Sequence, residues 1–352
     1  SVLVRKMLNI TEGLSYDDVL LVPQYSEIET RSPERISLAV KLPKIGTELK
    51  HPIIPANMKT VFGEEMAEAV YLSKGLGFLH RFMSIEGQLY IGSGLKGKFG
   101  HNVFNYIGFS VGVKKEDYEN VSKLIDNGAK IICIDIAHGD SKLCVDMCKF
   151  ISTKYPNVLL VAGNVCTKAG AKRLWETGAD IIKVGVGPGS ICSTRIETAA
   201  GMPQLTAIME VVLARKELIN SGKINDQKLI IADGGVKNSG DCVKGLCFAD
   251  LVMAGNLFAG TEEAPGTKIT KDGVLYKEYA GSSTHKSSHI EGVTTFVPYK
   301  GMYANVLDNL LQGIRSGCSY QGVDNLADLK ENPQFVKISS AGYRESIPHG
   351  VL

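Results

Sequence analysis

The chain has 352 residues, of which 44% are hydrophobic and 22% charged, and its formal net charge at pH 7 is +2. These values are typical of a globular protein, and a charge so close to zero gives no electrostatic case for nucleic acid or a membrane as the main partner. The sequence has no apolar run of the roughly 18 residues that a spanning helix needs, and no signal-like apolar core in residues 1–10. We therefore expect a cytoplasmic protein.

Eight short apolar segments follow one another along the chain and alternate with helical patterns. The segments occupy residues 52–57, 77–80, 107–113, 130–137, 158–165, 181–187, 229–235 and 251–257. The main helical patterns occupy residues 64–76, 116–127, 141–155, 167–178, 203–221 and 239–247, with Ser239 as a predicted N-cap. Continuous apolar runs are typical of strands buried on both faces of a parallel sheet. Eight such units favour an α/β fold of the TIM (β/α)8 barrel type over an open doubly wound sheet.

Three segments lie outside this repeat, within what we interpret as a single barrel catalytic domain over residues 1–352. Residues 1–50 form an N-terminal extension, residues 260–301 a polar flap insertion after strand eight, and residues 325–352 a polar tail. The KDG string at 271–273, between apolar residues, predicts a small hairpin within the insertion. The composition of the tail leads us to expect partial disorder there.

Two patterns argue against other kinds of site. The eight cysteines include no CxxC pair and no accompanying histidine cluster, so the spacing of a zinc site is absent. In a reducing compartment, we expect most of these cysteines to be free thiols. A GxGxxG string at 92–97 has no convincing strand before it and no helix pattern after it, so we do not interpret it as a dinucleotide-binding turn.

The strongest candidate for chemistry is the string GVGPGSICSTR at 185–195, directly after the sixth predicted strand. Gly187 and Gly189 would let the backbone approach a ligand closely, and Ser190 with neighbouring N–H groups could hold a phosphate. Cys192 would then lie on a loop at the catalytic end of a barrel, where exposed amides or a nearby cation favour a nucleophilic thiolate. A glycine-rich turn with a buried cysteine is the alternative interpretation.

Further polar residues follow the later strands. Asp233 and Gly235 come after the seventh strand and Gly255 and Asn256 after the eighth, and these two strands commonly build the phosphate site of a barrel. The carboxylate of Asp233 could accept hydrogen bonds from ribose hydroxyls, although simple turn chemistry explains the same residues. Glu291, in the insertion, is a candidate general acid or base.

These strings together resemble the IMP dehydrogenase/GMP reductase family. The likeness rests on LSYDDVLLVP at 14–23, the cysteine loop at 185–195, ADGGVKNSGD at 232–241, AGTEEAPG at 259–266 and VPYKG at 297–301. It implies a barrel that binds a purine nucleotide and a nicotinamide cofactor and whose cysteine attacks C2 of the purine. The dehydrogenase transfers hydride to NAD+ and then hydrolyses the adduct, whereas the reductase releases ammonia from GMP and takes hydride from NADPH.

Within the family, the sequence resembles the reductase more than the dehydrogenase. Dehydrogenases usually carry a regulatory domain of over 100 residues between strands two and three, where this chain has only residues 81–106. They also carry an Arg-Tyr pair on a long flap that activates water, whereas only nine residues separate Gly281 from Glu291, and none is Arg or Tyr. Ala56-Asn57-Met58 resembles the reductase as well. We expect a GMP reductase, with an IMP dehydrogenase lacking the regulatory insert as the alternative and an inert nucleotide-binding protein as a third reading.

The resemblance implies a role for each candidate residue. Cys192 is the nucleophile, and Thr194 with Glu291 handles the proton of the departing ammonia. The implied substrate contacts are Ser190, Gly235, Gly255, Asn256 and Tyr279 at the phosphate, Asp233 at the ribose, and Gly281, Ser282 and Gly292 at the base. The implied cofactor contacts, for NADPH, are Asp135, Asn164 and Arg81. Carbonyls of Gly187, Gly189 and Cys192 would hold a potassium ion, and the family implies a homotetramer.

Overall fold

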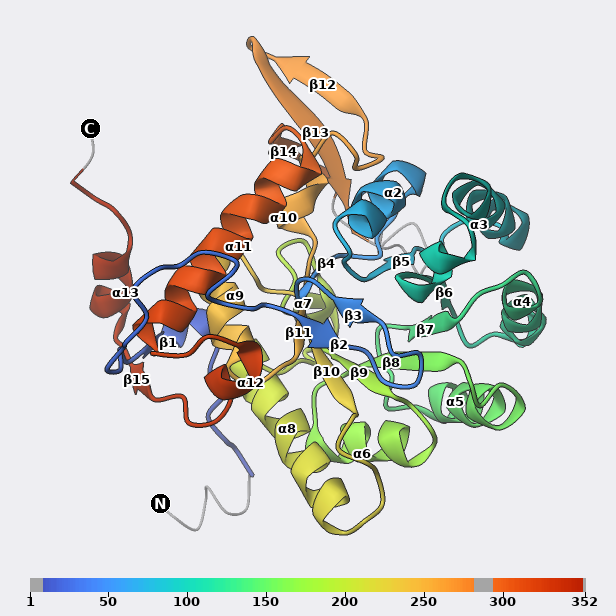
Figure 1. Cartoon of the computed structure of the whole chain (residues 1–352), viewed down its shortest axis with the longest axis horizontal. Helices are drawn as coiled ribbons and strands as arrows, with labels where there is room; N and C mark the ends of the chain where they lie inside the picture. The colour runs from blue at the N-terminus through green and yellow to red at the C-terminus, as the bar shows by residue number, and fades with distance from the viewer. Residues whose placement is uncertain (1–8, 282–293, 351–352) are drawn as a thin grey trace.

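A computed structural model describes residues 9–281 and 294–350. Its centre is a sheet of eight strands in the order β4-β11-β10-β9-β8-β7-β6-β5, in which every neighbouring pair is parallel. The strands are β4 (Ile53–Pro55), β5 (Gly77–Leu79), β6 (Ile107–Val111), β7 (Ile131–Asp135), β8 (Leu159–Val165), β9 (Ile181–Val184), β10 (Leu229–Asp233) and β11 (Leu251–Ala254). The sheet curves until it nearly closes, which confirms the predicted TIM barrel and all eight predicted strands (Figure 1).

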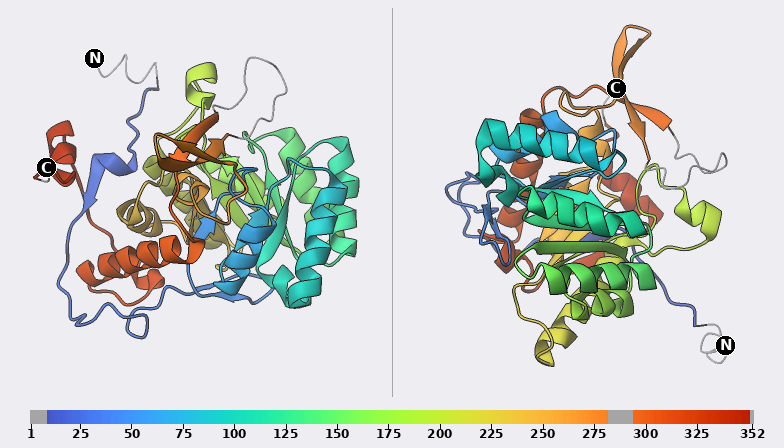
Figure 2. Two further views of the ribbon diagram at one scale, coloured as in Figure 1. Left: turned by 90° about the horizontal axis from the view of Figure 1, so that it is seen from above. Right: turned by 90° about the vertical axis from the view of Figure 1, so that its right-hand side faces the viewer.

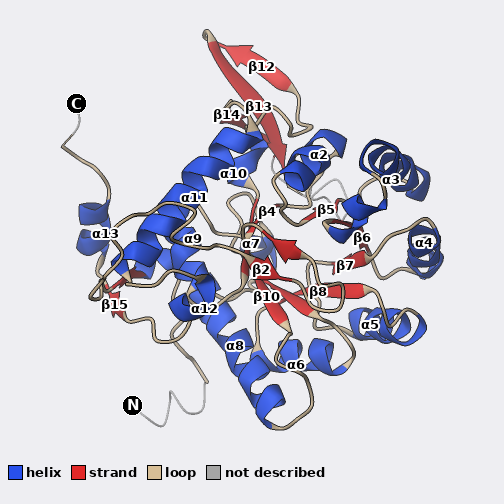
Figure 3. Ribbon diagram, viewed as in Figure 1, coloured by secondary structure: helices blue, strands red, loops and turns tan. Residues whose placement is uncertain are grey.

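Helices surround the strands, as Figure 3 shows by colour. They are α2 (Glu64–Leu72), α3 (Ile85–Phe99), α4 (Lys115–Asp126), α5 (Lys142–Lys154), α6 (Lys168–Glu176), α8 (Gln204–Asn220), α9 (Ser239–Leu246) and α11 (Tyr303–Tyr320). The six predicted helices are confirmed, but the N-cap of α9 is Asn238 and not Ser239, because the Asn238 side chain accepts the N–H of Asp241. Within the described parts of the chain, every helix is too short or too polar to span a membrane.

The glycine motif at 92–97 lies inside α3, which the sequence pattern did not predict. Gly92 faces the core there, since a Cβ at this position would lie 3.0 Å from the ring of Phe109. Gly92 therefore serves the close packing of α3 on the barrel, and the position of the motif inside a helix excludes a dinucleotide-binding turn.

The N-terminal extension covers the amino ends of the strands. Between β2 (Val40–Lys41) and β3 (Glu48–Leu49), Lys44 reaches Asp180 Oδ2 at 3.0 Å and the carbonyl of Val158 at 3.2 Å. Asp180, 2% exposed at its side chain, also accepts from Lys228 Nζ at 3.1 Å. Because this end of the barrel is closed by packing and ion pairs, the opposite end is left to form a site.

Three small sheets accompany the barrel in the described residues: β2 with β3, β1 (Val19–Leu21) with β15 (Phe335–Lys337), and a three-stranded sheet after β11. β12 (Lys268–Lys271), β13 (Val274–Ala280) and β14 (Thr294–Pro298) form an antiparallel sheet after β11 that projects from the barrel (Figure 1). The predicted hairpin is confirmed, with Asp272 and Gly273 at φ +51° and +76° in a two-residue turn.

The polar tail is more ordered than its composition led us to expect. It contains α12 (Leu326–Leu329), β15 (Phe335–Lys337) and α13 (Ser340–Ser346). β15 pairs antiparallel with β1 (Val19–Leu21) near the other end of the sequence. The pairing gives the backbone N–H and C=O groups of β15 hydrogen-bond partners, which composition alone does not reveal. The expectation of partial disorder was therefore wrong for residues 326–346.

Candidate functional site

A cavity of about 630 Å³ opens at the carboxyl ends of the barrel strands. This volume lies within the usual range for small-molecule sites. The cavity brings together every predicted site residue that the structure describes. They are Arg81, Asp135, Asn164, Gly187, Gly189, Ser190, Cys192, Thr194, Asp233, Gly235, Gly255, Asn256, Tyr279 and Gly281. Ser282, Glu291 and Gly292 lie outside the described residues.

Cys192 lies on the loop between β9 and the short helix α7 (Thr194–Thr198), which projects from the barrel in Figure 2. Of the eight cysteines, all within the described residues, only Cys192 is exposed. Its Sγ lies 3.3 Å from Thr194 Oγ1, and its backbone N–H donates to the Gly189 carbonyl at 3.1 Å. The alternative of a buried turn cysteine is therefore wrong, since the thiol faces the cavity and solvent.

The loop requires glycine where it passes Arg195. Gly187 has φ +85°, and a Cβ there would lie 2.6 Å from the Arg195 side chain. A side chain at this position would be strained both by the backbone conformation and by the contact. Gly187 thus helps to set the path of the loop that carries Cys192.

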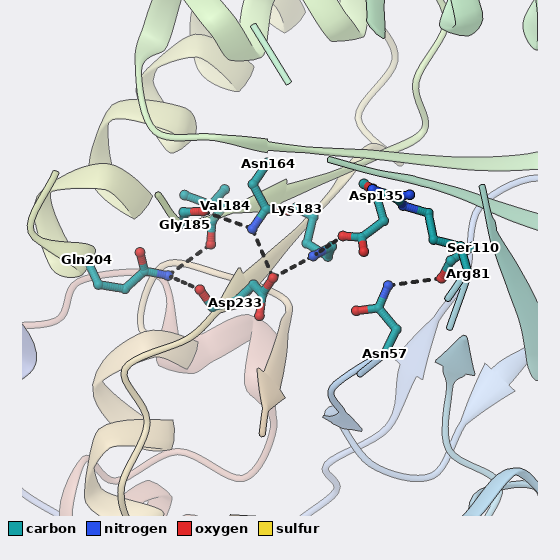
Figure 4. Close-up of polar contacts among 10 residues, drawn as sticks. All are labelled: Asn57, Arg81, Ser110, Asp135, Asn164, Lys183, Val184, Gly185, Gln204 and Asp233. Carbon is teal, nitrogen blue, oxygen red and sulfur yellow. Dashed lines mark hydrogen bonds and ion pairs between the residues drawn. The ribbon is translucent and has the colours of Figure 1, made fainter. Parts of the chain in front are cut away.

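A buried ion cluster forms the floor of the cavity, and sequence reasoning missed its central residue (Figure 4). Lys183 Nζ, on β9, lies 3.0 Å from Asp135 Oδ1 and 2.5 Å from Asp233 Oδ2. Burial by itself lowers the pKa of Lys183, but Asp135 and then Asp233 outweigh it, so its pKa lies above the ordinary value and the ammonium stays charged. The available signal was a single charged residue in the otherwise apolar string IIKVGVG.

Two amide side chains tie the cluster to the strand ends. Asn164 Nδ2 donates to the carbonyl of Gly185 at 2.8 Å and to Asp233 Oδ2 at 2.9 Å. Gln204 Nε2, at the start of α8, donates to the carbonyls of Val184 at 2.9 Å and Asp233 at 3.2 Å. Gln204 was not predicted, because nothing in the pattern of α8 marks its first residue as different. Together, the two amides hold the ends of β8, β9 and β10 in one arrangement.

The other side of the cavity is built from β4 to β7. Arg81 Nε donates to the carbonyl of Asp135 at 2.8 Å, and its guanidinium lies 4.9 Å from the centre of the Phe82 ring. Asn57, after β4, donates to Ser110 Oγ at 2.9 Å, and both residues are buried. These contacts fix Arg81 and Asn57 at the cavity wall next to Asp135.

Tyr279 reaches the cavity from β13. Burial raises the pKa of Tyr279 to about 12, and a hydrogen bond with Ser190 opposes that rise only in part, so the phenol stays neutral at physiological pH. A Cβ on Gly255 would lie 2.5 Å from Tyr279 Oη, so the tyrosine packs directly against that glycine. Ser190, Gly255 and Tyr279 therefore form one corner of the site with hydroxyl donors and exposed backbone.

The cavity can accommodate a nucleophilic substitution on a polar, hydroxylated ligand. It combines an exposed thiol beside a hydroxyl with carboxylates that can accept from ribose and neutral donors that can meet a phosphate. Asn164 Oδ1 is buried and has no hydrogen-bond partner within residues 9–281 and 294–350. The described residues contain no cluster of three or more His, Cys, Asp or Glu side chains suited to a metal ion.

Comparison with known proteins gives one consistent family. The model of the IMP dehydrogenase / GMP reductase domain matches residues 13–349. The inosine-5'-monophosphate dehydrogenase of Borreliella burgdorferi is 35% identical over 97% of this chain and 98% of its own length. The corresponding dehydrogenase of Aquifex aeolicus is 45% identical over 70% of this chain and 52% of its own. The GMP reductase of Leishmania major is 40% identical over 70% of this chain and 52% of its own, so the matched part of this chain corresponds to about half of the last two relatives.

Proposed function

Because the chain belongs to the IMP dehydrogenase/GMP reductase family of purine nucleotide oxidoreductases, we propose that it is a GMP reductase that converts GMP to IMP and ammonia at the expense of NADPH. The observation that carries the chemistry common to both activities of the family is the exposed Cys192 thiol, 3.3 Å from Thr194 Oγ1 and in the same cavity as the Asp135 and Asp233 carboxylates. The thiol can attack the nucleotide base, while the two carboxylates, on different strands, can each bind a different ligand. One cavity can therefore hold the nucleotide and the cofactor together.

The reaction divides a difficult substitution into two steps. The Cys192 thiolate adds to C2 of GMP, and the C2–N bond then breaks as ammonia leaves with a proton handled by Thr194 and Glu291. NADPH, when bound, supplies the hydride for C2. Cys192 then leaves C2 as a thiolate and IMP is released. In this scheme, Thr194 orients the proton transfer because its hydroxyl is within reach of the cysteine sulfur.

The remaining candidate residues divide between the two ligands. We assign Ser190, Gly235, Gly255, Asn256 and Tyr279 to the nucleotide phosphate, Asp233 to its ribose, and Gly281, Ser282 and Gly292 to the base. We assign Asp135, Asn164 and Arg81 to the cofactor. The three residues line the same cavity, and the hydrogen bond from Arg81 Nε to the Asp135 carbonyl, at 2.8 Å, supports assigning these two residues to one ligand.

The choice of the reductase rests on the residues that hydrolysis would need. Between Gly281 and Glu291 the sequence contains no Arg and no Tyr, so a water-activating pair of that kind is missing from this segment. Without it, hydride addition is the reaction left to resolve the adduct on Cys192. Identity to relatives does not separate the two activities, because the GMP reductase of Leishmania major and the inosine-5'-monophosphate dehydrogenase of Chlorobaculum tepidum are each 40% identical over 70% of this chain.

An IMP dehydrogenase is the second candidate, and one observation favours it. The Borreliella burgdorferi dehydrogenase aligns over 98% of its own length, whereas the Leishmania reductases align over about half of theirs. This second candidate would use NAD+ and would release XMP after hydrolysis of the adduct.

One absorbance assay distinguishes the two candidates. The protein is incubated with GMP plus NADPH and, separately, with IMP plus NAD+, and absorbance is followed at the reduced-nicotinamide band. We expect NADPH oxidation with GMP and formation of IMP and ammonia. Formation of NADH from IMP, with no oxidation of NADPH by GMP, would refute the reductase assignment. Cys192→Ala is expected to abolish turnover and to retain nucleotide binding.

Three further properties belong to the proposal. We propose a homotetramer, tested by light scattering after size-exclusion chromatography. We propose a potassium ion at the carbonyls of Gly187, Gly189 and Cys192, tested by the dependence of turnover on potassium against sodium. We also propose a cytoplasmic location, as for an enzyme of purine nucleotide interconversion.

A further inference from the structure

One buried lysine contacts both halves of the cavity. Lys183 Nζ lies 3.0 Å from Asp135 Oδ1 and 2.5 Å from Asp233 Oδ2, and the lysine side chain is 3% exposed. Asp135 ends β7 and Asp233 ends β10, on either side of the lysine in Figure 4. Under the proposed function, on which this inference rests, Asp135 belongs to the cofactor half of the site and Asp233 to the nucleotide half.

The environment of Lys183 suits it to hold the two carboxylates in place. A charged ammonium in the interior is stable only when it is paired and hydrogen-bonded, and these two carboxylates are its ion-pair partners among the described residues. Both pairing oxygens lie within 3.0 Å of the same nitrogen, so they are close neighbours of each other. Without the ammonium, two like charges at this separation would repel, and one carboxylate would turn away or take up a proton.

Each carboxylate also keeps an oxygen for a ligand. Asp233 Oδ2 accepts from Lys183 and, at 2.9 Å, from Asn164 Nδ2, whereas Asp233 Oδ1 has no hydrogen-bond partner in the described part of the chain. Asp135 likewise uses Oδ1 for the lysine, and the two carboxylate side chains are 19% and 18% exposed. The lysine therefore fixes one oxygen of each carboxylate on the floor of the cavity and leaves the other accessible from it.

We propose that Lys183 is a positioning residue shared by the two half-sites: a single ammonium holds Asp135 for the cofactor and Asp233 for the nucleotide. It touches neither ligand itself. The affinities for both ligands then depend on the same side chain, and a change at one carboxylate alters the site of the other ligand through the lysine.

The test measures binding rather than turnover, with IMP as the nucleotide because both activities of the family use it. Affinities for IMP, and for NADPH or NAD+, whichever the wild type binds, are measured by calorimetry for the wild type and Lys183→Met. We expect Lys183→Met to weaken both by about tenfold or more, as for loss of a hydrogen-bonded charge. When Asp233 is already Asn, adding Lys183→Met should change IMP affinity by less than about threefold, because the lysine no longer has that carboxylate to hold. When Asp135 is already Asn, adding Lys183→Met should likewise change cofactor affinity by less than about threefold.

Lys228→Met is the matched control, because Lys228 pairs with a buried aspartate at the opposite end of the barrel and its side chain is 13% exposed. It should leave both affinities unchanged. Unchanged affinities in Lys183→Met, or an equal loss in all backgrounds, would overturn the proposal, since an equal loss indicates general damage to the fold.

A second measurement keeps the test decisive if Lys183→Met does not fold. Asp233→Asn alone should then change cofactor affinity at least about threefold through the retained lysine, and no change would overturn the proposal. A wild type that binds IMP and NAD+ and forms XMP would refute the reductase assignment and leave this inference intact. A wild type that binds neither ligand would refute both.

Discussion

The exposed thiol of Cys192 predicts a selective reaction with iodoacetamide. The other seven cysteines are buried or half-buried, and the thiolate is the form that alkylates. Burial raises the pKa of Cys247 from 9.0 to about 12 and that of Cys318 to about 11. A rise from 9.0 to 12 lowers the thiolate fraction at neutral pH about 1000-fold, before any cost of opening the structure is added.

The assay treats the folded protein at pH 8, quenches samples at intervals and measures each cysteine peptide by mass spectrometry. We expect alkylation at Cys192 to be at least about 100-fold faster than at Cys247 or Cys318. Bound IMP should slow the reaction, and loss of activity should follow the labelling of Cys192. Cys192→Ser removes the fast site and serves as the control.

Two outcomes would refute this reasoning. Labelling of Cys247 or Cys318 at a rate within tenfold of Cys192 would show that the packing around them does not exclude reagent. A Cys192 that remains unlabelled while the protein loses activity would show that the accessible thiol is not the reactive group of the site.

Other predictions concern stability and the nucleotide corner. Burial lowers the pKa of His51 to about 4, so in acid the unfolded chain takes up this proton before the folded protein does, and stability should fall by about 3 kcal/mol from pH 6.5 to pH 4. Urea unfolding at several pH values measures this dependence of the free energy of unfolding on pH, which should be weaker in His51→Gln. An unaltered pH dependence would contradict the lowered pKa of His51. The side chain of Asp180 is 2% exposed and pairs with Lys44 and Lys228, so Asp180→Asn should lower the free energy of unfolding in urea by about 3 kcal/mol. Asp146→Asn, which breaks an exposed pair with Lys142, should lower it by under about 1 kcal/mol. Gly255→Ala should displace Tyr279, whose Oη would lie 2.5 Å from the new Cβ, and should weaken IMP binding about tenfold; wild-type affinity would show that this contact is easily relieved.

The sequence by itself determined the architecture of this protein and predicted the residues that meet in its cavity. Eight apolar runs alternating with helical patterns predicted the barrel, because burial on both faces leaves a local mark on each strand. The glycine-rich string around Cys192 predicted the loop at the carboxyl end of β9, since such a backbone path requires glycine locally. The glycine motif at 92–97 lacks a strand before it, which excluded a dinucleotide-binding turn, but its sequence did not predict the helix that contains it.

Only the tertiary structure decided which distant residues act together. Lys183 and Asp233 are 50 positions apart, and nothing local shows that one ammonium joins two carboxylates from two other strands. The pairing of β15 with β1, which orders the polar tail, likewise joins opposite ends of the sequence. Burial and ion pairing depend on neighbours that the fold supplies and the local sequence does not. The role of a single lysine in an apolar strand could therefore be inferred only once the barrel had placed its partners beside it.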